Sequence, residues 1–143
     1  MKRVMMCAVA AALLAANANA QFCASHSSYY DGKRYDFNIT HPQLDETPSW
    51  TEDAESPPLS PRKAIALASA CLSKLVPNAE KWRFAVLHLD PVGNKGKWIY
   101  VVEFHAPHPP GVFDGPVRTM NIVVLMNGNP VQPVISKYKL LGD

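Results

Sequence analysis

The residue types best suited to chemistry lie together in the segment 103–108. Glu103, His105 and His108 supply a carboxylate and two imidazoles, side chains that bind zinc or copper. Glu103 and His105 share one face of an extended strand, because successive side chains alternate between faces. Their spacing matches no metal motif, and no helical H-E-x-x-H is present. We therefore expect no metal site and no cofactor; these three residues are the candidates should a metal bind.

A nucleophilic enzyme needs a nucleophile, a base and an orienting group within mutual reach. The sequence has no G-x-S-x-G motif, and Cys71 lies among alanines and leucines, where a thiol is inert. We therefore expect a protein that is not an enzyme. The alternative hypothesis is a small periplasmic hydrolase or metal-binding protein that uses Glu103 and His105.

Two of these residues belong to a predicted central strand at 98–105. One face of this strand is aromatic and aliphatic throughout: Trp98, Tyr100, Val102 and Phe104. The other face begins with Ile99 and Val101 and ends with the ionisable pair. A strand that is apolar on both faces is usually covered on both sides, so the chain has to supply two covers.

The first cover is a helix predicted from Pro61 to Val76. Ser60 is a good N-cap, because its hydroxyl accepts from the free amides of the first turn, and Pro61 suits the first helical position. An apolar stripe recurs at three- and four-residue steps: Ile65, Ala68, Leu72 and Leu75 or Val76. Pro77 ends the helix.

Antiparallel strands are predicted at 81–89, 98–105 and 118–126, with a short fourth one at 131–136. Pro133 would confine the fourth strand to an edge, and Asn127-Gly128 is the strongest hairpin-turn signal that we identify. In the first strand, strict alternation puts these side chains on one face: Trp82, Phe84, Val86 and His88. The expected fold class is α+β, with one N-terminal helix packed on a three- to four-stranded antiparallel sheet.

The first twenty residues have the pattern of a secretory signal peptide. Lys2 and Arg3 give a positive start, an apolar run follows, and residues 18–20 form an A-x-A cleavage site. The alternative is an N-terminal membrane anchor, which the short apolar run disfavours. After cleavage no segment resembles the roughly 20 apolar residues of a membrane span. We expect a periplasmic or secreted protein.

Four segments are predicted in total: a signal peptide at 1–20, an acidic, proline-containing N-terminal arm at 21–58, an α+β domain at 59–136 and a tail at 137–143. Within the arm, only 35–39 has the alternation of a short strand. Removing Lys2 and Arg3 from the 14 basic residues leaves 12, which equals the number of acidic residues. A near-neutral chain lacks the basic surface of a nucleic-acid binder, so no nucleic-acid partner is expected.

Cys23 and Cys71 remain after signal cleavage. An even pair in an oxidising compartment predicts a disulfide, which would tie the arm to the predicted helix. Closing this loop would contribute about 3–4 kcal/mol in the chain-entropy model. The alternative is two unpaired thiols, with Cys71 as a small core residue.

Three segments of the domain carry a family resemblance: SPRKAIALA at 60–68, WIYVVEF at 98–104 and VVLMNGNPV at 123–131. They resemble the PepSY-like family, within the broader cystatin-like α+β superfold, over about residues 59–136. The resemblance implies an exported or membrane-associated domain without catalytic residues that binds or inhibits a peptidase or another partner. The loop at 106–116 and the acidic arm depart from the family pattern.

The sequence offers two candidate binding surfaces. The first is the proline-rich loop at 106–116, because a stiff loop loses little entropy on binding; its contact candidates are Pro107, His108, Pro109, Pro110 and Phe113. The alternative for this loop is a structural crossover. The second surface is the sheet face of Ile99 and Val101, which is too apolar to remain in water.

Either the arm or a second copy of the chain would cover that second face, and the arm is favoured because the expected disulfide would tether it. The main hypothesis is therefore an exported, non-catalytic module that binds a protein or peptide, with inhibition as one outcome. A structural subunit that forms a homodimer through the second face is a further alternative.

Overall fold

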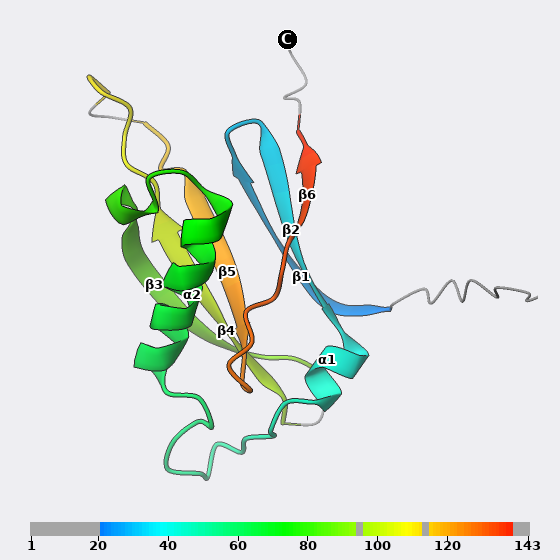
Figure 1. Ribbon diagram of the computed structural model, residues 1–143. Coiled ribbons are helices and arrows are strands. Elements are labelled where there is room, and N and C mark those ends of the chain that lie inside the picture. Colours follow the sequence, from blue (N-terminus) through cyan, green and yellow to red (C-terminus); the bar gives the residue numbers. More distant parts are fainter. Residues whose placement is uncertain (1–20, 94–95, 113–114, 139–143) are drawn as a thin grey trace, which may run out of the picture.

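The computed structural model describes residues 21–93, 96–112 and 115–138 (Figure 1). The expected signal peptide at 1–20, Phe113 and most of the expected tail lie outside these residues. None of the helices in the described ranges is long and apolar enough to cross a membrane.

The described residues form two three-stranded antiparallel sheets. The first sheet has the order β1-β2-β6, with β1 at Phe22–Tyr30, β2 at Lys33–Thr40 and β6 at Val134–Lys137. The second has the order β3-β4-β5, with β3 at Arg83–Pro91, β4 at Trp98–His105 and β5 at Thr119–Leu125. The helices are α1 at His41–Asp45, α2 at Pro61–Leu75 and the 3-10 turn η1 at Ala79–Lys81.

The α+β class is therefore confirmed, with two corrections. The long helix α2 is central in the chain and not N-terminal, because the arm that precedes it is also folded. The strands are also divided between two sheets, where the sequence suggested one sheet of three to four strands.

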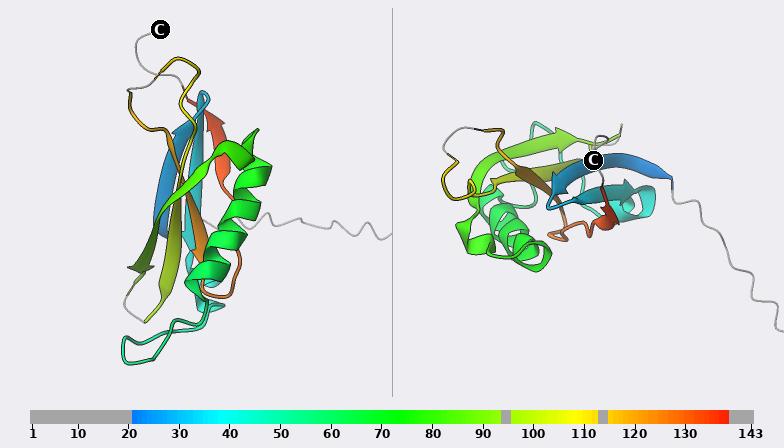
Figure 2. Two further views of the ribbon diagram at one scale, coloured as in Figure 1. Left: turned by 90° about the vertical axis from the view of Figure 1, so that its left-hand side faces the viewer. Right: turned by 90° about the horizontal axis from the view of Figure 1, so that it is seen from above.

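Helix α2 begins where the sequence predicts. Ser60 Oγ accepts a hydrogen bond from Lys63 N at 3.3 Å, and Pro61 is the first helical residue. The helix lies over one face of the β3-β4-β5 sheet (Figures 1 and 2) and contacts β4 and β5. Tyr100 Oη donates to Leu59 O at 2.9 Å, immediately before the helix. The predicted first cover of β4 is thus present.

The first half of the predicted arm, residues 22–40, forms a β-hairpin, whereas residues 46–58 form no helix or strand. β1 and β2 pair along their length, with Tyr30 opposite Lys33. Asp31 and Gly32 between them have φ values of 51° and 66°, which fit the two positive φ values of a type I′ turn. The short strand expected at 35–39 is confirmed as the buried part of β2, with Tyr35, Phe37 and Ile39 in the core.

The two sheets meet along the outer edge of β5. Asn121 N donates to Ser28 Oγ of β1 at 2.9 Å, and Ser28 is buried. Farther along the same strand, Val123 O accepts from Val131 N at 2.9 Å. The outer edge of β5 is therefore occupied by β1 and by the segment around Val131, so it is not an open edge available for pairing with another strand.

A strand forms near the C-terminus, but beside a different neighbour than expected. Asn127-Gly128 does turn the chain, with a φ of 87° at Gly128, yet only an isolated bridge from Val124 to Pro130 follows. Pro130 and Pro133 have no amide hydrogen, so this part of the chain cannot extend a regular ladder on β5. The chain continues to β2, where Val134 pairs opposite Asp36.

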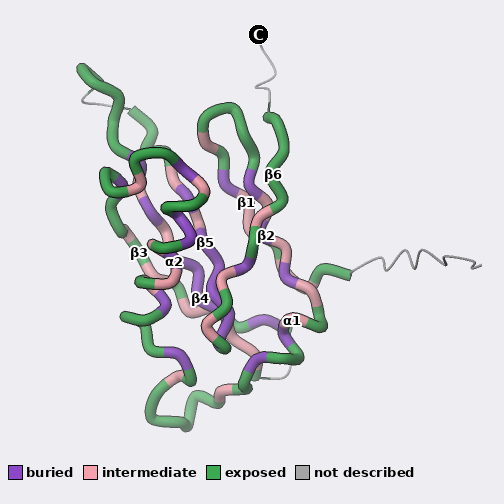
Figure 3. Tube along the Cα trace, in the orientation of Figure 1, coloured by how far each residue is buried: buried purple, intermediate pink, exposed green. Residues whose placement is uncertain are grey.

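The apolar part of the second face of β4 is buried within the chain, and Figure 3 shows that most of this strand is buried. Ile99 is 0% exposed and Val101 is 4% exposed. Both belong to the same core as Phe37 and Ile39 of the hairpin. Ile99 and Val101 are therefore not a free binding surface, which corrects their choice as contact candidates. The shared core agrees with the favoured hypothesis that residues 21–58 cover this face, and no second copy is needed.

A β-bulge in β3 changes which side chains share a face. Phe84 lies opposite Phe104 and Val86 opposite Glu103, so Ala85 is the extra residue. Because Phe104 and Glu103 project from opposite faces of β4, Phe84 and Val86 do so on β3. The prediction that they share a face is wrong, since strict alternation fails at a bulge.

The expected disulfide is not formed, and both cysteines carry free thiols. Cys23 Sγ donates to Ile39 O at 3.0 Å within the hairpin, whereas Cys71 is buried on α2. Burial raises the pKa of both thiols above the ordinary value, which disfavours the thiolate that disulfide formation requires. Strand pairing with β2 holds β1 in place instead.

Candidate binding site

The loop between β4 and β5 leaves the sheet through a closed root. Ala106 N donates to Arg118 O at 2.9 Å, and Arg118 Nη2 donates to Pro107 O at 3.1 Å. Beyond this root, the described loop residues are exposed. Figure 1 shows the loop projecting from one end of the molecule.

The described part of the loop has little freedom of its own. Val112 N donates to Pro109 O at 3.1 Å and closes a turn, and Pro107, Pro109 and Pro110 restrict the backbone. Val112 and Val117 are exposed apolar side chains. Four of the five predicted loop residues therefore lie on an exposed segment, while Phe113 falls outside the described residues.

Two aromatic rings lie beside the root of the loop. The ring centroids of Tyr30 and Trp82 are 4.8 Å apart in an edge-to-face arrangement, which is a preferred geometry for aromatic pairs. The Arg118 guanidinium lies 5.3 Å from the Tyr30 ring centroid, within the range of a cation–π contact. The end of β1, the start of β3 and the start of β5 thus meet at one point.

A cleft of about 370 Å³ separates the loop from the turn that follows α2. Its lining comes from the loop, the turn and the aromatic pair: Tyr30, Pro77, Asn78, Lys81, Trp82, Pro107, His108, Pro109, Pro110 and Arg118. Lys81 and Arg118 are cationic, and none of the described residues in this lining is acidic. The cleft therefore suits a ligand with apolar groups and a negative charge.

A second cleft of about 490 Å³ adjoins the first along Pro77, Asn78 and Trp82. Its floor includes Phe84 and Phe104, and its helical wall belongs to α2. Asn78 adopts the left-handed conformation with a φ of 53°, which asparagine tolerates better than most residues. This turn lets the chain reverse between α2 and η1 and forms the boundary shared by both clefts.

The structure brings together two of the three candidate metal ligands. His105 Nε2 lies 2.7 Å from Glu103 Oε1, and both side chains are partly exposed. His108 is instead exposed in the loop and lines the first cleft. Within the described ranges, no group of three or more histidine, cysteine, aspartate or glutamate residues is arranged to hold a metal.

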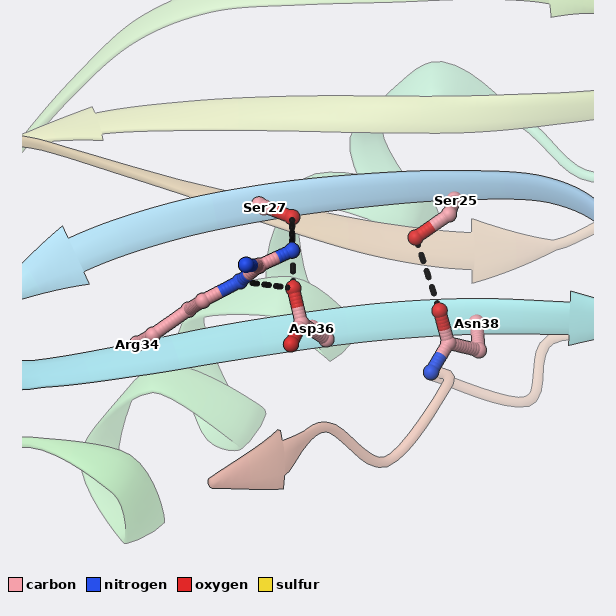
Figure 4. Close-up of polar contacts among 5 residues, drawn as sticks. All are labelled: Ser25, Ser27, Arg34, Asp36 and Asn38. Atoms are coloured by element: carbon pink, nitrogen blue, oxygen red, sulfur yellow. Dashed lines mark hydrogen bonds and ion pairs between the residues drawn. The ribbon is translucent and has the colours of Figure 1, made fainter. Parts of the chain in front are cut away.

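A polar cluster on the hairpin uses its groups internally (Figure 4). Asp36 Oδ1 accepts from Ser27 Oγ at 2.5 Å and from Arg34 Nε at 2.7 Å. The hydrogen bond from Ser27, and to a smaller extent that from Arg34, lowers the pKa of Asp36 below its ordinary value. Ser25 Oγ donates to Asn38 Oδ1 at 2.7 Å in the same way. These are cross-strand pairs that hold β1 to β2.

No local sequence pattern identified Tyr30, Trp82 and Arg118 as residues of the loop end, the end of the molecule from which the loop 106–116 projects (Figure 1). Tyr30 precedes Asp31-Gly32, a hairpin signal that places its side chain at the end of a strand. Trp82 precedes β3 and Arg118 precedes β5. All three therefore lie at strand ends, but their convergence depends on the two sheets meeting, which no local pattern indicates.

No family model matches the chain, and no match was found among curated proteins or solved structures. The resemblance of residues 59–136 to PepSY-like domains stays a prediction.

Proposed function

We propose that this protein is an exported, non-catalytic module that binds a polypeptide partner at its loop end. The observation that supports the proposal is the first cleft, where aromatic rings, prolines and cationic groups share one surface. Aromatic and arginine side chains contribute most to protein interfaces. The resemblance to PepSY-like domains favours a peptidase or another envelope protein as the partner, with inhibition as the proposed consequence.

The preferred partner segment carries an acidic residue next to an apolar one. Lys81 and Arg118 favour the carboxylate, and Tyr30 and Trp82 offer faces and edges for the apolar side chain. The closed root and the prolines hold the loop in place before binding. Such preorganisation lowers the entropy cost of binding.

The loop can be tested by capture from the native envelope fraction. The full chain is the bait, and the test variant replaces residues 107–116 with glycine and serine while keeping Ala106 and Arg118. A matched control replaces 51–56, an exposed segment at the opposite end of the molecule (Figure 1). We expect the wild type and the control to capture the same protein and the loop variant to lose it. Equal capture by the loop variant would reject the proposed site.

A second candidate function is metal binding or hydrolysis at Glu103 and His105, where a carboxylate oxygen and an imidazole nitrogen lie 2.7 Å apart. Calorimetric titration of the protein with zinc tests this alternative. Heat that disappears in Glu103→Gln and His105→Asn variants would support a site there. No heat in the wild type would remove zinc binding at this pair.

A further inference from the structure

The outer edge of β3 is open along a nine-residue strand. β3 pairs with β4 on one side, and no strand of the described residues pairs with it on the other. An edge strand presents unpaired amide and carbonyl groups that can pair with another chain. Of the other outer strands, β1 and β5 face each other. The strand β6 has only four residues, so β3 offers the longer free ladder.

Both faces of this edge carry an exposed apolar side chain. Phe84 is 47% exposed on the face that α2 covers, and Val86 is 41% exposed on the opposite face. No residue of β3 is buried, in contrast to β4 and β5, as Figure 3 shows. A strand added at this edge would remove apolar surface from water on both faces.

We propose that a second copy of this chain pairs with β3 in the antiparallel direction, about a two-fold axis at Leu87. The bulge sets the register, because Ala85 does not occupy a ladder position of its own. Moving outward from Leu87, Val86 then lies opposite His88 of the second copy. Phe84 lies opposite Leu89, and Arg83 opposite Asp90.

Each of these pairs joins side chains on the same face. Arg83 lies opposite His105 and Asp90 opposite Ile99 within the chain, and His105 and Ile99 share a face of β4. By the same argument, Phe84 and Leu89 share the face of Phe104 and Tyr100. A strand of this length without the bulge would place Arg83 and Asp90 on opposite faces.

Charge complementarity favours the second copy as the occupant. In the proposed register, Arg83 of each chain meets Asp90 of the other, so two opposite-charge pairs flank the axis. Arg83 is exposed, and neither residue takes part in the ion pairs found in the described residues. Opposite charges directly across a strand pair stabilise it, and like charges destabilise it.

Sedimentation velocity of protein purified after expression of the full sequence, over a series of concentrations, tests the proposal. We expect a dimer whose dissociation constant rises roughly tenfold in Arg83→Asp and in Asp90→Arg, because each change puts like charges opposite each other. The double variant R83D/D90R restores the dimer, because it reverses both pairs. Arg62→Asp on α2 is the control and leaves the dimer unchanged. A monomer at all concentrations, or single variants that dimerise like the wild type, would overturn the proposal.

Cysteine cross-linking tests the register. Leu87→Cys puts two thiols opposite each other, with Cβ atoms about 4.5–5.5 Å apart, near the separation that a disulfide accepts. His88→Cys is the matched control, because it faces Val86 and not its own copy. We expect a covalent dimer from L87C alone on mild oxidation, and equal cross-linking of H88C would contradict the register. Both experiments use the chain alone, so their outcome is independent of partner capture at the loop end.

Discussion

At the residue scale, Arg118 connects the parts of the loop end. Its carbonyl accepts from Ala106 N, its guanidinium donates to Pro107 O, and the same guanidinium faces the Tyr30 ring. One residue, through its backbone and its side chain, therefore positions the loop root relative to the hairpin and also lines the first cleft. The residues that flank Arg118 in the sequence do not predict its contact with Tyr30, because the two residues are far apart along the chain.

The hydrogen bonds to Asp36 predict an acid-dependent contribution to stability. The lowered pKa of Asp36 means that the folded state favours the carboxylate. Its contribution is present above the unfolded pKa of about 3.9 and is lost as pH falls through the lower folded pKa. Urea unfolding at a series of pH values should therefore show that the free energy of unfolding falls less at acidic pH in Asp36→Asn than in the wild type. Ser27→Ala should reduce this fall by a smaller amount. Identical dependence of the unfolding free energy on pH for all three proteins would refute this contribution.

Burial of Ile99 predicts a role in stability and not in partner contact. Ile99→Ala should lower the free energy of unfolding by about 2–5 kcal/mol, because it leaves a cavity in the core. The capture of a partner by the folded fraction should remain unchanged. A variant of wild-type stability that no longer captures the partner would show that Ile99 is a surface residue after all.

At the element scale, the hairpin β1-β2 is the largest departure from the expected architecture. Asp31-Gly32 was a usable signal for it, since Asp-Gly favours a type I′ turn. The bulge at Ala85 had no comparable signal, because the sequence of β3 is compatible with a regular strand whose side chains alternate between the two faces. The helix α2 and the strand β4 were predictable, because capping, apolar periodicity and β-branched residues act locally.

The turn between β1 and β2 predicts a specific sensitivity at Gly32. Its φ of 66° is in the left-handed region, and an added Cβ would meet no atom closer than 4.0 Å. Gly32→Ala should therefore destabilise the protein by about 1–2 kcal/mol through backbone strain alone. Gly32→Asn is the matched control and should cost less, because asparagine tolerates this conformation. Equal unfolding free energies for the alanine variant and the wild type would argue against the turn.

At the scale of the whole molecule, the chain closes one core with two sheets and a helix. The fold class followed from the sequence, but the pairing of β6 with β2 and the meeting of β1 with β5 did not. These contacts join segments far apart in the chain, and local patterns constrain them weakly. The candidate site was predictable only as the exposed loop 106–116, while its aromatic and cationic neighbours depended on those long-range contacts.

The free thiols give a simple test of this arrangement. Intact mass of the unreduced protein should show Cys23 and Cys71 both reduced, because Cys23 contacts Ile39 in the hairpin and Cys71 is buried on α2. Alkylation under denaturing conditions should then add a label to each cysteine. A mass two hydrogens lower, with no labelling, would place the two cysteines in contact and contradict the fold.

The most direct test of the binding site is the affinity of the captured partner for the wild type and for the variant with residues 107–116 replaced. Isothermal titration should give a dissociation constant at least about tenfold higher for the loop variant, which corresponds to about 1.4 kcal/mol or more. The control variant at 51–56 should bind like the wild type. Equal affinities for the wild type and the loop variant would contradict a binding site at the loop end.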